Sequence, residues 1–244
     1  MKGMELLAGV ALAAGLWGCA ARRAPESYAN GASPVSLSRE HEEEGGRPDD
    51  WEERQVWLAR RGLEFTGDGV RIDEALARDL EYEPGPAASR ERVSRSAEFL
   101  SHNAVIRAIG AARDAVLADR TNASAYAALG RALIAEREDD LALDAYKTAS
   151  RLDPGSAPIR AALGDAFNRN GERESARSSY QQAVGLDPTD AKSFGRLAVL
   201  DYYLGDDLAA WRHAREAERL GGGVPPQFLV LLRERTPEPG ATKP

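Results

Sequence analysis

Cys19 is the residue whose type and position most clearly predict chemistry, since it is the only cysteine in the 244-residue chain. A single cysteine excludes an internal disulfide framework. It follows an apolar run of small residues, 6–18, which lies behind Met1 and Lys2. That run is too short to cross a bilayer as a helix, but its length suits the hydrophobic part of an export signal. A thiol at the end of an export signal can carry a lipid anchor.

The segment 16–19, Leu-Trp-Gly-Cys, resembles the lipobox of bacterial lipoproteins, in which a small residue precedes an invariant cysteine. In that family the thiol forms a thioether with diacylglycerol, and the signal peptidase cuts after the small residue, here Gly18. The resemblance implies a signal peptide at 1–18 and a lipid-anchored Cys19. Because Ala20 follows rather than aspartate, it also implies the periplasmic face of the outer membrane. An uncleaved amphipathic or buried N-terminal helix with an incidental cysteine is the alternative.

The rest of the sequence predicts no catalytic or metal chemistry. The three histidines, His41, His102 and His213, are scattered and have no second ligand or nucleophile at a useful spacing. Neither a nucleophile elbow nor a phosphate-binding glycine loop is present. The net charge of −7 argues against nucleic acid, because phosphate binding needs a basic face. We therefore expect no enzymatic activity, metal, cofactor, small-molecule substrate or nucleic-acid partner.

A repeat organises the second half of the chain. Small, large and proline positions return every 34 residues, as Leu129, Leu163 and Leu197, as Gly130, Gly164 and Ala198, as Ala142, Ala176 and Ala210, and as Pro154 and Pro188. The small positions predict close contacts between the two helices of a hairpin. The prolines end one helix and begin the next repeat, since proline cannot continue a helix interior.

The period and the pattern resemble the tetratricopeptide repeat (TPR), whose first helix reads W-x2-L-G-x2-Y and whose second carries A-x3-F. The resemblance covers three repeats in residues 123–222. Residues 87–122 fit it as a degenerate hairpin with Arg95-Ser96 in place of Leu-Gly, and the third copy departs from it at Asp201. The resemblance implies an all-α solenoid whose first helices line a concave face that binds peptides or helices.

The other segments are predicted to serve this solenoid. Residues 223–235 should form a helix that caps the last repeat, because solenoids need their terminal apolar face covered. The alternating apolar residues on both sides of 66–69 predict a β-hairpin. The remaining boundaries are a disordered tether at 19–49, a small helix–β-hairpin–helix appendage at 50–86 and a disordered tail at 236–244.

The resemblance also selects residues that would face a partner in the groove. Carried over position by position, these are Arg131, Asp165, Asn168, Arg169, Lys192, Arg196 and Tyr202. Lys192 and Arg196 lie one helical turn apart and match two cationic positions of the family's carboxylate clamp. Ala127 and Ala162, however, stand where that clamp needs lysine and asparagine. A carboxylate or acidic-peptide site and an ordinary solvated cationic face both remain open, and the second is favoured.

Two functions are consistent with these features. The first is a membrane-anchored adaptor that assembles or localises subunits of an envelope machine, such as a secretin, pilus, motility or secretion complex. The second is a structural scaffold lipoprotein for cell-envelope or peptidoglycan maintenance, which would bind a wall enzyme. In both, the concave groove holds a protein or peptide, and a fold by itself does not identify that partner.

Overall fold

The computed structural model describes residues 56–59, 61–65, 70–73 and 83–239. The predictions for the signal peptide (1–18), for Cys19 and for the tether (19–49) therefore concern residues outside the described ones. Within the described segments, every helix is too short or too polar to cross a bilayer.

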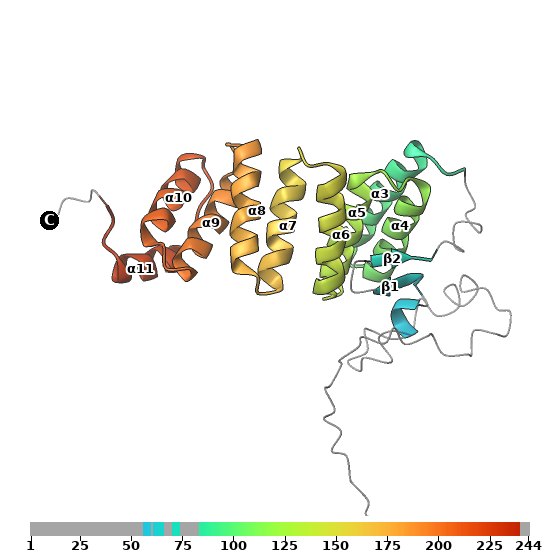
Figure 1. Ribbon diagram of the computed structural model, residues 1–244, viewed down its shortest axis with the longest axis horizontal. Coiled ribbons are helices and arrows are strands. Elements are labelled where there is room, and N and C mark those ends of the chain that lie inside the picture. The colour runs from blue at the N-terminus through green and yellow to red at the C-terminus, as the bar shows by residue number, and fades with distance from the viewer. Residues whose placement is uncertain (1–55, 60, 66–69, 74–82, 240–244) are drawn as a thin grey trace, which may run out of the picture. The chain divides into compact units, whose positions relative to one another are not determined.

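Helices α3 to α11 follow one another in hairpin pairs (Figure 1). Their bounds are α3 Pro86–Ser101, α4 Val105–Ala118, α5 Ala123–Ala135, α6 Asp139–Leu152, α7 Ala157–Arg169, α8 Arg173–Leu186, α9 Ala191–Tyr203, α10 Asp207–Arg219 and α11 Pro226–Arg235. The predicted all-α solenoid is confirmed, with three hairpins in 123–222, one hairpin before them and one helix after them.

The first helices of the hairpins form the inner layer of the stack. Each one packs on the second helix of the preceding hairpin, as α5 does on α4, α7 on α6 and α9 on α8. In addition, α3 contacts α5 and α5 contacts α7, so successive first helices approach one another. We call the surface formed by α5, α7 and α9 the inner face.

A glycine beneath a tyrosine makes the closest contact inside the second and third hairpins. A Cβ atom added to Gly130 would lie 2.8 Å from the ring of Tyr146, and one added to Gly164 would lie 2.8 Å from the ring of Tyr180. Both rings are buried. The prediction that these positions must be small because two helices meet there is confirmed.

In the first and last hairpins, alanine takes the place of the tyrosine in the equivalent pair. One period earlier the two positions are Ser96 and Ala112, and one period later they are Ala198 and Ala214, all of them buried. Alanine in place of tyrosine leaves room for the Ser96 side chain, whose hydroxyl donates to the Ala108 carbonyl at 2.9 Å. The hairpin of α3 and α4 is thus a variant of the same unit, in which a buried serine bond replaces ring packing.

The turns between paired helices repeat the same backbone conformation. Asn103, Arg137, Gly171 and Gly205 stand 34 residues apart, and their φ angles are 58°, 65°, 79° and 83°. All four lie in the left-handed region, which glycine adopts freely and asparagine tolerates. Arg137 adopts it at the position where the other two repeats of 123–222 carry glycine. Hydrogen bonding of the turn, including Glu138 N to the Leu133 carbonyl at 2.9 Å, accompanies this conformation.

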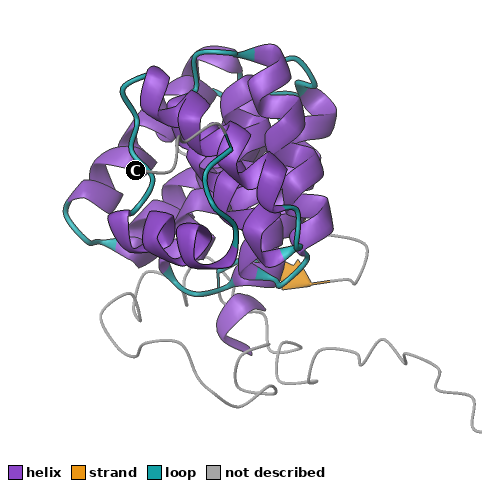
Figure 2. Ribbon diagram, turned by 90° about the vertical axis from the view of Figure 1, so that its left-hand side faces the viewer, coloured by secondary structure: helices purple, strands orange, loops and turns teal. Residues whose placement is uncertain are grey.

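The appendage packs on the N-terminal hairpins. Strands β1 (Leu63–Phe65) and β2 (Val70–Ile72) pair antiparallel with Leu63 opposite Ile72, as the alternation predicted. Figure 2 shows the described strands at the margin of the helical body. Trp57, Leu58 and Leu63 are buried in one cluster with side chains of α4, α5 and α6. Appendage and solenoid therefore share a core, which satisfies the requirement that so short a segment be stabilised by a larger body.

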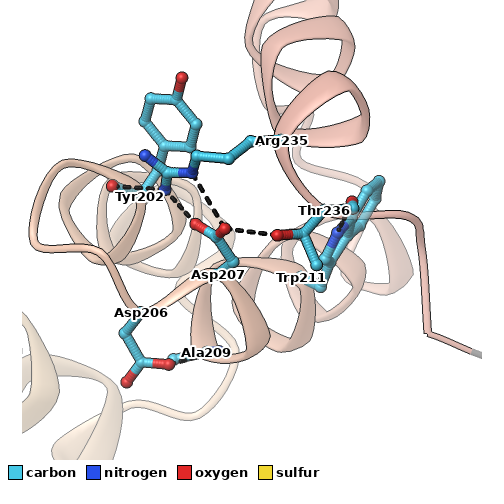
Figure 3. A network of polar contacts seen from close by, with 7 residues as sticks. All are labelled: Tyr202, Asp206, Asp207, Ala209, Trp211, Arg235 and Thr236. Carbon is cyan, nitrogen blue, oxygen red and sulfur yellow. Dashed lines mark hydrogen bonds and ion pairs between the residues drawn. The ribbon is translucent and has the colours of Figure 1, made fainter.

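Helix α11 covers the C-terminal end of the stack. Phe228 and Leu232 are buried against Trp211 and the alanines of α9 and α10. Arg235 is held between the Tyr202 ring, 3.6 Å from its centroid, and the Asp207 carboxylate (Figure 3). The capping role predicted for this helix is confirmed.

Residues 236–239, the first part of the tail predicted to be disordered (236–244), make contacts with α10 in the structure; residues 240–244 lie outside the described ones. Trp211 Nε1 donates to the Thr236 carbonyl at 3.0 Å, and the Thr236 hydroxyl donates to Asp207. Arg215 pairs with Glu238 at 3.4 Å. These contacts order residues 236–239 on α10, and composition alone does not reveal them because their partners lie over 20 residues away in the chain.

Gly164→Ala is expected to lower the free energy of unfolding by ~1–2 kcal/mol, because the added methyl group meets the buried Tyr180 ring. Gly110 on α4 is the matched control, since a Cβ atom there meets nothing within 4 Å. Gly110→Ala should instead raise the free energy by up to ~1 kcal/mol through helix propensity. Denaturant unfolding followed by circular dichroism measures both, and changes of the same sign would contradict the glycine–tyrosine contact.

Candidate functional site

Three residues from successive helices form a polar cluster on the inner face. Asp165 of α7 and Arg196 of α9 make an ion pair with 2.7 Å between Oδ1 and Nε. The Tyr180 hydroxyl, from α8, donates to the same oxygen, and the Arg196 guanidinium lies 5.8 Å from the Tyr180 ring centroid. Side chains of Asp165 and Arg196 are 34% and 45% exposed. The positive charge of Arg196, which the family pattern places in the groove, is therefore already compensated by the Asp165 carboxylate.

The two inner tyrosines keep their protons at physiological pH. Burial raises the pKa of Tyr146 to about 12, an effect that Arg131 partly offsets and Asp165 reinforces. Burial also raises the pKa of Tyr180 far above its usual 10, and the hydrogen bond to Asp165 adds to this shift. Both hydroxyl groups therefore keep the hydrogen that a donor needs, and the Tyr180 hydroxyl donates it to Asp165.

Arg131 and Lys192 are the exposed cations of the inner face that remain available. Each makes no ion pair within the part of the chain that the structure describes. Lys192 stands in the first turn of α9, where its backbone N–H donates to the capping Asp190 carboxylate at 3.1 Å. Asn168, near the end of α7, is also exposed.

Arg169 serves the contact between hairpins. Its Nε lies 2.6 Å from the Asp139 carboxylate, which joins the end of α7 to the start of α6. One period later, the Arg173 guanidinium lies 5.5 Å from the Tyr203 ring centroid in the equivalent place. This repeated pairing gives Arg169 a role in stacking and separates it from the residues of the inner face.

Tyr202 lies at the C-terminal end rather than beside the other selected residues. Its ring makes an edge contact with Phe228, at 5.7 Å between centroids, and Arg235 covers it (Figure 3). The structure thus brings together Asp165 and Arg196 with Tyr180, and it places Tyr202 under the capping helix.

Two features of the polar architecture escaped sequence reasoning. The first is the hydrogen bond from the Tyr180 hydroxyl to Asp165. The second is Asp201, which is fully buried, with 2.7 Å from Oδ1 to Arg177 Nε and 2.6 Å from Oδ2 to His213 Nδ1. Its only sequence signal was a carboxylate where the repeat calls for an aromatic residue.

The Asp201 cluster joins three helices. Arg177 comes from α8, Asp201 from α9 and His213 from α10, and Arg177 also pairs with Asp206 at 3.2 Å. A buried carboxylate compensated by two basic groups is a common way to satisfy a charge inside a protein. Among the described residues, no group of three or more potential metal ligands occurs.

A family model described as tetratricopeptide repeat matches residues 157–190, which span α7 and α8. The chain contains a tetratricopeptide repeat. No curated protein matches the sequence at a significant level.

Solved TPR-type structures share the fold at low sequence identity. The structure of PilF from Pseudomonas aeruginosa is 22% identical, covering 62% of this chain and 72% of that one, with a TM-score of 0.56. A MamA crystal structure is 21% identical over 56% of this chain and 80% of that one, with a TM-score of 0.52. A MamA double mutant covers 78% of this chain and 96% of that one, at 18% identity and a TM-score of 0.51. These similarities establish the TPR-type solenoid.

Proposed function

We propose that this protein is a non-enzymatic, membrane-anchored adaptor that binds a protein or peptide along the inner face of its TPR stack. The observation that carries the proposal is the set of exposed charged side chains that α5, α7 and α9 present on one face, outside the packed core. TPR-type folds are generally interaction modules, and rigid helices hold such side chains in a fixed spacing that an extended ligand can match.

The site of action that we propose is the periplasmic face of the outer membrane. This rests on the lipobox-like segment before Cys19. There the adaptor would assemble or localise subunits of an envelope machine of the secretin, pilus, motility or secretion type.

Replacing Lys192 and Arg196 together by alanine tests the adaptor function. Both side chains are exposed, and a surface ion pair such as Arg196–Asp165 contributes only ~0–1 kcal/mol to folding. The melting temperature should therefore change little, while the partner should be lost from a membrane pull-down followed by mass spectrometry. Added salt should weaken the wild-type complex, because exposed charges are screened.

A matched control removes two positive charges from a second helix, outside the inner face. Arg212 and Arg219 are exposed on α10, a second helix, so Arg212→Ala with Arg219→Ala should leave the captured partner unchanged. If the inner-face variant recovers the partner at wild-type yield, the binding site lies elsewhere. If the recovered protein is a wall enzyme, the scaffold function replaces the envelope-machine function.

Cys19→Ser should abolish incorporation of labelled fatty acid and leave an uncleaved precursor. Serine offers no thiol from which the thioether could form. The variant should also leave the membrane, because each buried methylene of the lost anchor contributes ~0.8 kcal/mol to membrane binding. Because Cys19 is the only cysteine, the lipid label reports on it alone. Normal cleavage and labelling in this variant would remove the lipoprotein assignment.

A further inference from the structure

The inner face contains two versions of one polar site, 34 residues apart. In the later version, the Asp165 carboxylate accepts the Tyr180 hydroxyl and pairs with Arg196. Counting back one repeat, Tyr180 corresponds to Tyr146, Asp165 to Arg131, and Arg196 to Ala162. The earlier version therefore keeps the tyrosine and an arginine, but has no carboxylate.

Tyr146 is held in the same way as Tyr180. Its ring lies over Gly130, the residue next to Arg131, as the ring of Tyr180 lies over Gly164. Arg131 lowers and Asp165 raises the pKa of its phenol, in keeping with the position of the ring beside Gly130 and Arg131. The tyrosine at 146 is thus oriented as a donor by the same contact that orients the tyrosine at 180.

The donors of the earlier version have no acceptor in the part of the chain that the structure describes. Among the described residues, neither the Arg131 guanidinium nor the Tyr146 hydroxyl makes a hydrogen bond or ion pair. Ala127 and Ala162, which pack against the cluster that contains Tyr146, supply no polar group. Arg131 stands to Tyr146 as Asp165 stands to Tyr180 one repeat later, so the guanidinium and the protonated hydroxyl suit one carboxylate, since both donate hydrogen bonds.

We propose that Arg131 and Tyr146 bind an aspartate or glutamate side chain of an extended acidic peptide in a protein partner. This rests on the adaptor function above and names the chemistry that its groove recognises. The Asp165 carboxylate, held by Tyr180 and Arg196, is the internal example of the contact. Lys192, further along the face on α9, offers a second cation to the same peptide.

The whole-protein charge makes binding of an acidic peptide a selective test of this assignment. The chain carries a net charge of −7, so an acidic peptide is repelled on average and binds only where cations are concentrated. Affinity for such a peptide would therefore report a specific local site rather than general attraction.

Fluorescence anisotropy with the full-length protein in detergent tests the site. The probe is a labelled synthetic peptide of alternating Asp and Ser, acetylated and amidated so that only side-chain carboxylates carry charge. Tyr146→Phe removes one hydrogen bond and should weaken binding about 3–10-fold. Arg131→Ala removes a charged donor and should weaken it about tenfold or more. Arg212→Ala, an exposed change on α10, should leave the affinity within about twofold of the wild type, since it does not touch the site.

A double variant separates loss of the site from loss of the fold. Arg131→Asp with Ala162→Arg rebuilds the Asp165–Tyr180–Arg196 arrangement around Tyr146, so the chain fills its own site. This variant should melt at or above the wild-type temperature and bind the acidic peptide no better than Arg131→Ala does. Wild-type affinity in the double variant overturns the proposal.

Two further results also overturn it. One is binding of an Asn-Ser peptide with a free C-terminus in preference to the amidated acidic peptide, which would assign the site to a terminal carboxylate. The other is an absence of acidic-peptide binding at low ionic strength. If the native partner is still captured in either case, the adaptor function stands without this site. A different outcome is that the Lys192→Ala, Arg196→Ala variant still captures the native partner while the Arg131 and Tyr146 variants lose the acidic peptide. The carboxylate site then stands, and the native partner binds at another surface.

Discussion

Asp201→Ala is expected to lower the free energy of unfolding by about 3 kcal/mol, a large effect for a residue that takes no part in binding. The carboxylate is fully buried, and it lies within ion-pair distance of Arg177 and His213 from the neighbouring helices. Its removal leaves a partly buried guanidinium without its nearest carboxylate. The loss falls at the lower end for a broken buried pair because Arg177 keeps Asp206 at 3.2 Å.

Denaturant unfolding followed by circular dichroism measures this effect. Asp201→Asn retains the shape and can still accept from His213, so it should cost less than alanine does. Glu218→Ala, an exposed change on α10, should alter the free energy by less than ~0.5 kcal/mol. An Asp201→Ala variant as stable as Glu218→Ala would mean that the cluster contributes no net stability.

Leu232→Ala should lower the free energy of unfolding by ~2–4 kcal/mol, because it leaves a cavity under the capping helix. Leu232 is fully buried among Trp211, Ala214 and Phe228. A solenoid repeat gains its stability largely from contact with its neighbours, so a weakened cap exposes the face of the last hairpin. Hydrogen exchange should accelerate first in α10 and α11, and only later in α5 and α6.

The adjacent leucine provides the control. Leu231 is 48% exposed on the same helix, so Leu231→Ala should cost less than ~1 kcal/mol. Equal losses at the two positions would contradict the orientation of α11. Uniform acceleration of exchange along the whole chain would contradict end-on unfolding.

The repeat register could be predicted because it is local and periodic. Leucine, glycine, alanine and proline recurred at one spacing, and each of these residue types restricts the backbone or the helix spacing in a known way. Helix positions and the close contact at Gly130 and Gly164 followed from that register, whereas the tyrosine rings that make this contact did not. The capping helix followed from the need to cover the last apolar face.

The functional face was predicted only in part. The family positions selected both Asp165 and Arg196, but not the ion pair that joins them across α7 and α9. Arg169 and Tyr202 were selected by the same rule, and the structure uses them in stacking and under the cap. A position within a repeat specifies the face of a helix, whereas the partner on that face depends on the neighbouring hairpin.

The sequence by itself determined the helical hairpins, their 34-residue period and the small residues at their contacts, because these depend on interactions within one repeat. Only the tertiary structure decided which charges are compensated. Asp165 meets Arg196 from 31 positions away, Asp201 meets Arg177 and His213 inside the core, and Arg131 and Tyr146 meet no carboxylate among the described residues. Such pairings depend on how one hairpin is rotated and spaced against the next, since a charge–charge contact weakens steeply over a few ångströms.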